Sequence, residues 1–152
     1  MGSVQSQVHQ PIEELEVFRA FEEIATWCWS QIESWKPHHR DTVGRQLIRA
    51  IDSVGANLVE GDGRYSSADA LHFFIVARGS AREARLWLER AKQRSLVSRE
   101  HAEAIEDQLV RATKLLNLLI NYRRSKVSPV PKRVRETVGE LRRTNTDSEA
   151  HS

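Results

Sequence analysis

The chain has 152 residues, of which 29% are charged and only one is cysteine, and its formal net charge is +2. This length fits a single domain that can bury a core without disulfides or a structural metal. A lone cysteine excludes an internal disulfide, and no apolar run approaches the roughly 18 residues that a membrane span needs, so we expect a cytoplasmic protein with no membrane partner.

The charges are unevenly distributed along the chain. Residues 1–35 hold one arginine against six glutamates, a net charge of −5, so the remaining residues carry +7. The most basic block, residues 123–143, contains eight lysines and arginines and two glutamates. A basic region of this kind favours a polyanionic partner, although an ordinary solvated surface gives the same pattern.

Two helices are predicted in the first part of the chain, because apolar residues recur there at alternating spacings of three and four. The first covers residues 12–34 and ends before Pro37, since proline disfavours helix in the residue that precedes it. The second covers residues 41–60, with Asp41 as its expected N-cap. Two glycines follow it, and we expect them to end the helix in the left-handed conformation.

Two more helices are predicted by the same spacing in the second part of the chain. The third covers residues 67–94, and the fourth runs from the N-cap Ser98 to about residue 124. The side chains expected in the core are Phe18, Phe21, Ala25, Cys28, Ile32 and Trp35; Val43, Leu47, Ile51, Val54 and Leu58; Phe74, Ala77, Ala81, Ala84, Leu88 and Ala91; and Ile105, Leu109, Ala112, Leu116 and Leu119.

The connections between these helices are short, which predicts that neighbours run antiparallel. The expected fold is therefore an all-α, up-down-up-down four-helix bundle over residues 12–125. Residues 1–11 are expected to be a flexible N-terminus, and residues 126–152 a basic, largely disordered tail. A short helix around residues 133–142 is compatible with the sequence, but few apolar residues are available there to stabilise it.

The third helix carries apolar residues beyond its core row. Phe73, Ser80 and Trp87 form a second row, and in residues 70–77 only one side chain is polar. A helix that is apolar on nearly all sides must be covered on more than one side. We therefore predict a homo-oligomer, with Phe73, Val76 and Trp87 in the subunit interface.

No pattern in the sequence indicates a cofactor, a metal site or an enzyme. Bundles that bind two metal ions carry two Glu-x-x-His motifs, whereas this chain has one related pair, Asp69 and His72. His38 and His39 are adjacent, with no third ligand at a zinc-binding spacing. The single Cys28 lies among apolar residues and is expected to pack in the core rather than to act as a nucleophile.

One catalytic alternative comes from a short spacing near the start of the fourth helix. Arg94 and His101 are spaced much as in the HEPN family of RNA-cleaving helical bundles. That family usually has Asn, Asp or His after the arginine, whereas this chain has Ser95. A HEPN-like ribonuclease is therefore the less favoured alternative function.

A resemblance to a known family rests on residues 52–64, Asp-Ser-Val-Gly-Ala-Asn-Leu-Val-Glu-Gly-Asp-Gly-Arg. This stretch is similar to the signature of the bacterial four helix bundle protein family, which includes proteins encoded in intervening sequences of 23S ribosomal RNA genes. The chain departs from that pattern with Gly55 in place of proline and Val59 in place of alanine. The matching residues are Ser53, Asn57, Glu60, Gly61, Gly63 and Arg64, with Phe73, Ala77, Gly79, Ser80 and Glu83 downstream.

A second resemblance concerns residues 84–88, Ala-Arg-Leu-Trp-Leu, which are similar to the accessory variability determinants of diversity-generating retroelements. Those proteins form pentameric barrels, assist a reverse transcriptase and bind nucleic acid through basic surfaces. The resemblance therefore implies a homopentamer without catalysis of its own, and a reverse transcriptase as a partner.

The residues of the signature also have a structural interpretation. Gly61 and Gly63 are expected to permit the reversal between the second and third helices. Asn57 and Glu60 lie in the last turn of the second helix and are expected to form hydrogen bonds across that turn, with Arg64 within reach of Glu60. We therefore interpret these five residues as a structural turn motif rather than as a ligand site.

The functional prediction rests on Arg78, Arg82, Arg85 and Lys92, which share one side of the third helix. Such a row can follow the phosphates of RNA or DNA without reading the sequence. This predicts a non-catalytic, oligomeric nucleic-acid-binding accessory protein. The alternative is an assembly module that binds a protein partner and no nucleic acid.

Overall fold

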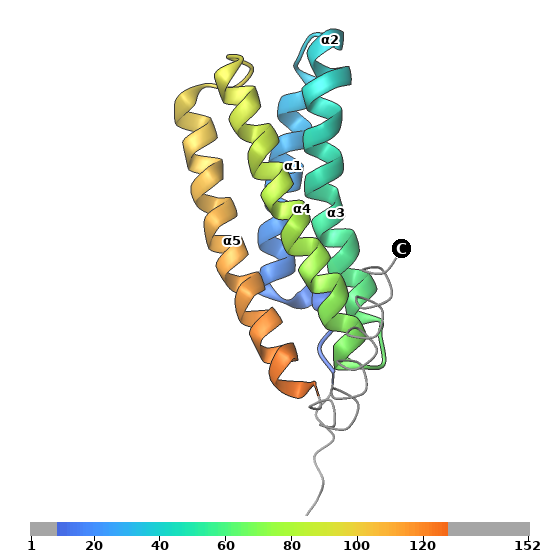
Figure 1. Ribbon diagram of the computed structural model, residues 1–152. Helices are drawn as coiled ribbons and strands as arrows, with labels where there is room; N and C mark the ends of the chain where they lie inside the picture. The colour runs from blue at the N-terminus through green and yellow to red at the C-terminus, as the bar shows by residue number, and fades with distance from the viewer. Residues whose placement is uncertain (1–8, 128–152) are drawn as a thin grey trace, which may run out of the picture.

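The computed structural model describes residues 9–127, and every regular element in this part of the chain is helical. Four long helices lie side by side, and in Figure 1 each runs back along the one before it. The predicted all-helical four-helix bundle is confirmed. Its elements are η1 (Ile12–Glu14), α1 (Glu16–Glu33), α2 (Pro37–His39), the π-helical turn η2 (Arg40–Gly44), α3 (Arg45–Asp62), α4 (Ser67–Gln93) and α5 (Arg99–Lys126).

The core contains a row of buried side chains from each long helix. Along η2, α3 and α4 the buried residues include all those that the spacing predicts, from Val43 to Leu58 and from Phe74 to Ala91. The row of α1 is broader than predicted. Val17 and Ile24 are buried, whereas Phe18 is only partly buried.

The buried row of α5 agrees with the prediction as far as Leu116. Beyond it Ile120 is buried, and the predicted Leu119 is only partly buried. The helix has 3.6 residues per turn, so a strict seven-residue repeat drifts around its surface. After several turns this drift moves the buried position along α5 by one residue, from Leu119 to Ile120.

The second helix begins earlier than predicted. Its first residue is Pro37, which suits this position because the first N–H of a helix has no partner within the helix. Asp41 therefore lies inside the helix, in the π-helical turn, and its side chain caps nothing. The turn brings the chain close to α1, since a Cβ on Gly44 would lie 2.8 Å from Ile32 Cγ2.

The corner between α3 and α4 differs from the prediction in its backbone. Helix α3 continues through Gly61 to Asp62, and Gly63 has a φ of −74°. Neither glycine is left-handed. Gly61 is needed instead for close packing, because a Cβ there would lie 2.7 Å from Phe74 Cε1.

The connection between α4 and α5 contains the one non-glycine residue of the described chain with a positive φ, Ser95 at 57°. Ser98 caps α5 as predicted, since its Oγ accepts a hydrogen bond from the His101 N–H at 3.2 Å. Helix α4 begins in the same way, at the N-cap Ser66. These caps fix where both helices of the α4–α5 hairpin start.

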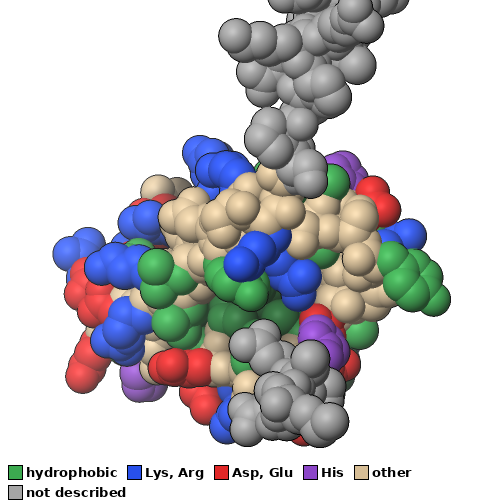
Figure 2. Space-filling model, turned by 90° about the horizontal axis from the view of Figure 1, so that it is seen from below, with side chains coloured by type: hydrophobic (Ala, Val, Ile, Leu, Met, Phe, Trp, Pro, Cys, Tyr) green, Lys and Arg blue, Asp and Glu red, His purple; other side chains and the backbone are tan. Residues whose placement is uncertain are grey.

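At the lower end of the bundle, Asp62 joins three parts of the chain. Its Oδ2 accepts hydrogen bonds from the Ile12 backbone N–H at 3.2 Å and from His9 Nε2 at 3.3 Å. Its Oδ1 lies 3.9 Å from Arg123 Nη2 on α5. Viewed from below, this end shows hydrophobic side chains with basic ones beside them (Figure 2). The other residues of the two predicted termini, 1–8 and 128–152, lie outside the described residues.

Candidate nucleic-acid interface

Three of the four basic residues that the sequence places on one side of α4 lie next to α5. Arg82 and Arg85 are exposed, whereas Arg78 is half-buried. Arg78 Nη1 donates a hydrogen bond to Asn117 Oδ1 on α5 at 3.1 Å. This bond holds the Arg78 guanidinium at the seam between the two helices.

A groove of about 260 Å³ lies along the same seam. Arg82 and Arg85 line it from α4, and Lys114 lines it from α5. Its floor is apolar and two neutral polar groups face it, so among the described residues that line it there is no carboxylate. The lining residues are Ala81, Arg82, Arg85, Leu109, Val110, Thr113, Lys114 and Asn117.

Lys114 is the residue of this groove that sequence reasoning missed. It lies on α5, so no spacing within α4 reveals it. The short connection between the two helices predicts that α5 lies beside α4, but the register comes from the structure, where the Arg78 contact with Asn117 brings residues 110–114 level with Arg82 and Arg85. The groove therefore depends on the register of two helices rather than on one helical row.

Lys92, the fourth predicted residue, has a different environment. Its Nζ lies 2.7 Å from Glu89 Oε2 and 3.7 Å from Glu106 Oε1. The hydrogen bond with Glu89 raises the pKa of Lys92, and the same bond lowers the pKa of Glu89. The ammonium is thus held between two carboxylates, away from the groove lining.

The turn motif joins α3 to α4 through side chains. Arg64 donates a hydrogen bond to Glu60 Oε1, as the sequence predicts. Asn57 forms its hydrogen bonds within α3, over one turn of the helix. Its Nδ2 donates back along α3 to the Ser53 carbonyl at 2.8 Å, and Ser53 Oγ lies 3.0 Å from Ser80 Oγ on α4.

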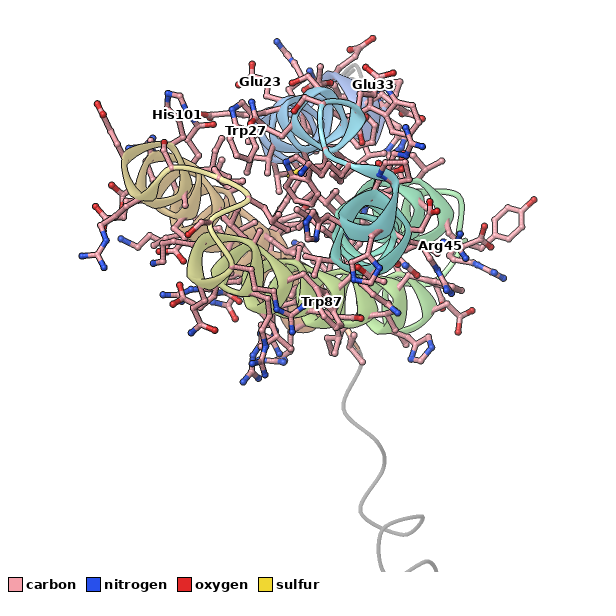
Figure 3. The ribbon with its side chains drawn as sticks, turned by 90° about the horizontal axis from the view of Figure 1, so that it is seen from above. Glu23, Trp27, Glu33, Arg45, Trp87 and His101 are labelled. Atoms are coloured by element: carbon pink, nitrogen blue, oxygen red, sulfur yellow. The ribbon has the colours of Figure 1, made fainter. Side chains whose placement is uncertain are left out.

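The residues predicted for the subunit interface lie on the outer part of α4. Val76 is 39% exposed, and Trp87 is half-buried on the outside of α4, as Figure 3 shows. Phe73 is half-buried and covered by the Arg64 guanidinium, which lies 4.6 Å from its ring centroid. The neighbouring exposed apolar residues are Ile75 and Leu86.

Residues 13–118 match the sequence pattern of the 23S rRNA-intervening sequence protein family. The chain belongs to this family. The match covers the turn motif and both helices of the basic groove, and it ends before the last turns of α5. No curated protein matches the chain.

A solved structure supports the same assignment. It is the crystal structure of a protein of unknown function from the S23 ribosomal protein family of Bacteroides thetaiotaomicron. The two sequences are 26% identical, and the alignment covers 68% of this chain and 97% of that one, with a TM-score of 0.63. The bundle of this 23S rRNA-intervening sequence protein therefore has a counterpart of similar fold in an experimental structure.

The residues considered for metal binding or catalysis are dispersed. Asp69, His72 and His38 are exposed, and no group of three potential metal ligands occurs among the described residues. Cys28 is buried, and burial raises the pKa of its thiol to about 12, so the thiolate is not available at neutral pH. None of the described helices is both long and apolar enough to cross a membrane.

Arg94 and His101, the pair that suggested a ribonuclease, are both exposed at the connection between α4 and α5. The backbone N–H of His101 is used by the Ser98 cap. Its ring lies on the side of α5 toward Trp27 of α1 (Figure 3).

The structure also reveals a carboxylate pair that the sequence did not indicate. Glu22 on α1 and Asp52 on α3 line one groove with Trp29. Burial raises the pKa of both carboxyl groups, and the charge of Asp52 raises that of Glu22 further. Gly55 makes room for this pair, since a Cβ there would overlap Glu22 Oε1.

Proposed function

We propose that this 23S rRNA-intervening sequence protein is a non-catalytic accessory protein that binds RNA or DNA along the α4/α5 groove. The observation that carries the proposal is the groove itself, in which Arg82, Arg85 and Lys114 converge and none of the described lining residues is acidic. Phosphate contacts made by such cations supply affinity without sequence specificity. The Arg78 hydrogen bond to Asn117 fixes a fourth cation at the same seam.

A second groove on α4 supports this choice by contrast. It lies between α3 and α4 and is lined by Arg49 but also by Asp52 and Glu83. The carboxylates there would repel a phosphate backbone. A polyanion therefore meets a more favourable field at the α4/α5 groove.

Assembly would strengthen binding that is weak in one copy. We propose that the antiparallel bundles pack into a homopentameric ring through the outer side of α4, where Val76, Ile75 and Leu86 expose apolar surface. A ring repeats the basic groove, and several weak contacts with one nucleic acid add to a strong overall affinity. The likeness of residues 84–88 to the accessory proteins of diversity-generating retroelements supports a reverse transcriptase as a further partner.

The exposed apolar residues of α4 also favour a second candidate, an assembly module that binds a protein and no nucleic acid. In that case the arginines of the groove would contribute to solubility alone. The two candidate functions make different predictions about whether the wild-type protein binds nucleic acid.

The deciding experiment is filter binding of mixed-sequence RNA and DNA oligonucleotides at low and moderate salt. Wild-type protein should bind, and the double variant Arg82→Glu/Arg85→Glu should bind at least about tenfold more weakly, since each lost charge-assisted contact is worth about 1 kcal/mol or more. The matched control is Arg90→Glu/Arg111→Glu, which makes the same charge change at exposed residues outside the groove lining. Equal losses in both variants would contradict the site, and no binding by the wild type would favour the assembly module.

A further inference from the structure

The last turns of α5 carry an apolar surface that no described residue covers. Leu118 is 66% exposed and Tyr122 is 58% exposed. Arg111 and Leu115 line a groove between α1 and α5, and Leu118 and Tyr122 continue their row at spacings of three and four. This row therefore extends the α1/α5 groove toward the lower end of the bundle.

The opposite edge of this groove is acidic. Glu16 and Glu23 of α1 line it, both are exposed, and neither forms an ion pair with a described residue. Figure 3 shows Glu23 on the side of α1 that faces α5, and Glu33 on the other side. We call the row of Leu115, Leu118 and Tyr122, together with Glu16 and Glu23, the α1/α5 surface.

An apolar strip with an acidic edge complements a segment that is apolar on one side and basic elsewhere. Residues 130–143 of this chain have apolar residues at spacings of four, four and three, and a net charge of +3 from five basic residues against Glu136 and Glu140. The segment lies beyond the residues that the family pattern matches. Its apolar residues are Val130, Val134, Val138 and Leu141, and its basic residues are Lys132, Arg133, Arg135, Arg142 and Arg143.

We propose that residues 132–143 bind the α1/α5 surface of their own chain, antiparallel to α5. Twelve residues of helix span about 18 Å, the length of α5 from Leu115 to its last residue, Lys126. Pro129 and Pro131 occupy the reversal, where a helix has to stop. This alignment places Val138 between the levels of Tyr122 and Leu118, and Leu141 between those of Leu118 and Leu115.

The consequence is a different role for the basic tail. From the sequence alone the tail was expected to be largely disordered, because it has too few apolar residues to fold by itself. The α1/α5 surface offers the apolar partner that the segment lacks. Its carboxylates lie beside Leu115, where the alignment places Arg142 and Arg143. The bound tail neutralises the acidic side of α1 rather than serving as a second nucleic-acid-binding arm, and this assignment does not depend on nucleic-acid binding.

Disulfide trapping in the full-length chain tests the contact. The double variant Leu118→Cys/Leu141→Cys should form an intramolecular disulfide under mild oxidation, and native Cys28 does not compete because it is buried with a pKa of about 12. In the control Ile75→Cys/Leu141→Cys, the first cysteine replaces an exposed apolar residue of α4. The first pair should cross-link at least about tenfold faster, because a bound segment has a higher effective concentration than a free one. Equal rates, or a product with the mass of two chains, would overturn the proposal.

The acidic edge supplies a second readout in the same cysteine pair. Glu16→Lys/Glu23→Lys should slow formation of the disulfide between positions 118 and 141 several-fold. Glu33→Lys should leave the rate unchanged, because Glu33 faces away from α5. If the double reversal leaves the rate unchanged as well, the carboxylates do not hold the segment and the assignment is wrong.

Discussion

Gly61 and Phe74 fit together at the corner between α3 and α4, where the Phe74 ring fills the space that a side chain on Gly61 would occupy. A Cβ on Gly61 would lie 2.7 Å from Phe74 Cε1 and 3.0 Å from Phe73 Cβ. Phe74 is fully buried, so the ring has little room to move. The glycine is therefore required by the packing of two helices and not by its own backbone conformation.

We expect Gly61→Ala to lower the free energy of unfolding by about 1–3 kcal/mol, the usual cost of overfilling a packed core. Gly79→Ala is the matched control, because Gly79 lies in the interior of α4 and a Cβ there meets nothing within 4 Å. The control should instead gain about 0.5–1 kcal/mol from its better helix propensity. Urea unfolding followed by circular dichroism, at one protein concentration, measures both. A loss of stability in both variants would mean that Gly61 is not limited by Phe74.

The rows of the core were predictable from the sequence because they depend on helical periodicity alone. The heptad spacing of α4 gave every buried residue from Phe74 to Ala91, and the N-cap of α5 was readable from Ser98. The signature residues indicated a corner, but the reason for Gly61 was not readable, since it depends on which ring from α4 faces it.

The candidate site was only partly predictable for a similar reason. Arg78, Arg82 and Arg85 share a side of α4, and periodicity alone places them together. Lys114 joins them only through the register between α4 and α5, and Lys92 leaves them because Glu106 approaches it from α5. Contacts between helices decide which basic side chains are free to bind a phosphate. The spacing of residues along a single helix does not reveal those contacts.

The Glu22–Asp52 pair predicts a stability that depends on pH. Burial raises the pKa of each carboxyl group in the folded state, so the folded protein holds these protons more tightly than the unfolded chain does. The charged pair therefore destabilises the fold above the raised pKa values, and this cost disappears as the pH falls below the ordinary values.

Asp52→Asn should accordingly raise the melting temperature at pH 7, by about 1–2 °C, because both side chains remain partly exposed to water. At a pH below the ordinary carboxyl range, the variant and the wild type should melt together. Asp107→Asn, which removes an exposed carboxylate on α5, is the control and should show no such difference. A gain that persists unchanged at acidic pH would rule out the titration of this pair as its cause.

For the predicted assembly, Val76→Asp is a cleaner probe than a change at Phe73. Phe73 packs against Gly61 and Arg64 within its own chain, whereas Val76 is 39% exposed. Burying a new carboxylate in a subunit interface is costly, so Val76→Asp should sediment as a single 17.4 kDa chain while the wild type has about five times that mass. Leu118→Asp, which places the same carboxylate at a more exposed apolar residue of α5, should leave the oligomer intact. A wild-type protein that sediments as a monomer at micromolar concentration would contradict the interface.

The last prediction separates the α4/α5 groove from a simple basic row on α4. Lys92 belongs to the row but lies between Glu89 and Glu106, whereas Lys114 belongs to the groove and not to the row. Removing a phosphate contact lowers the slope of log affinity against log salt by about 0.7–0.9 per contact in the binding site. Lys114→Gln should therefore weaken binding of a mixed-sequence oligonucleotide and flatten this slope, while Lys92→Gln should change neither. The two variants remove the same charge, so any loss of affinity from net charge alone would be equal in both, and only a difference between them reports a contact. If Lys92→Gln flattens the slope as much as Lys114→Gln, phosphates follow the row along α4 and the groove is not the site.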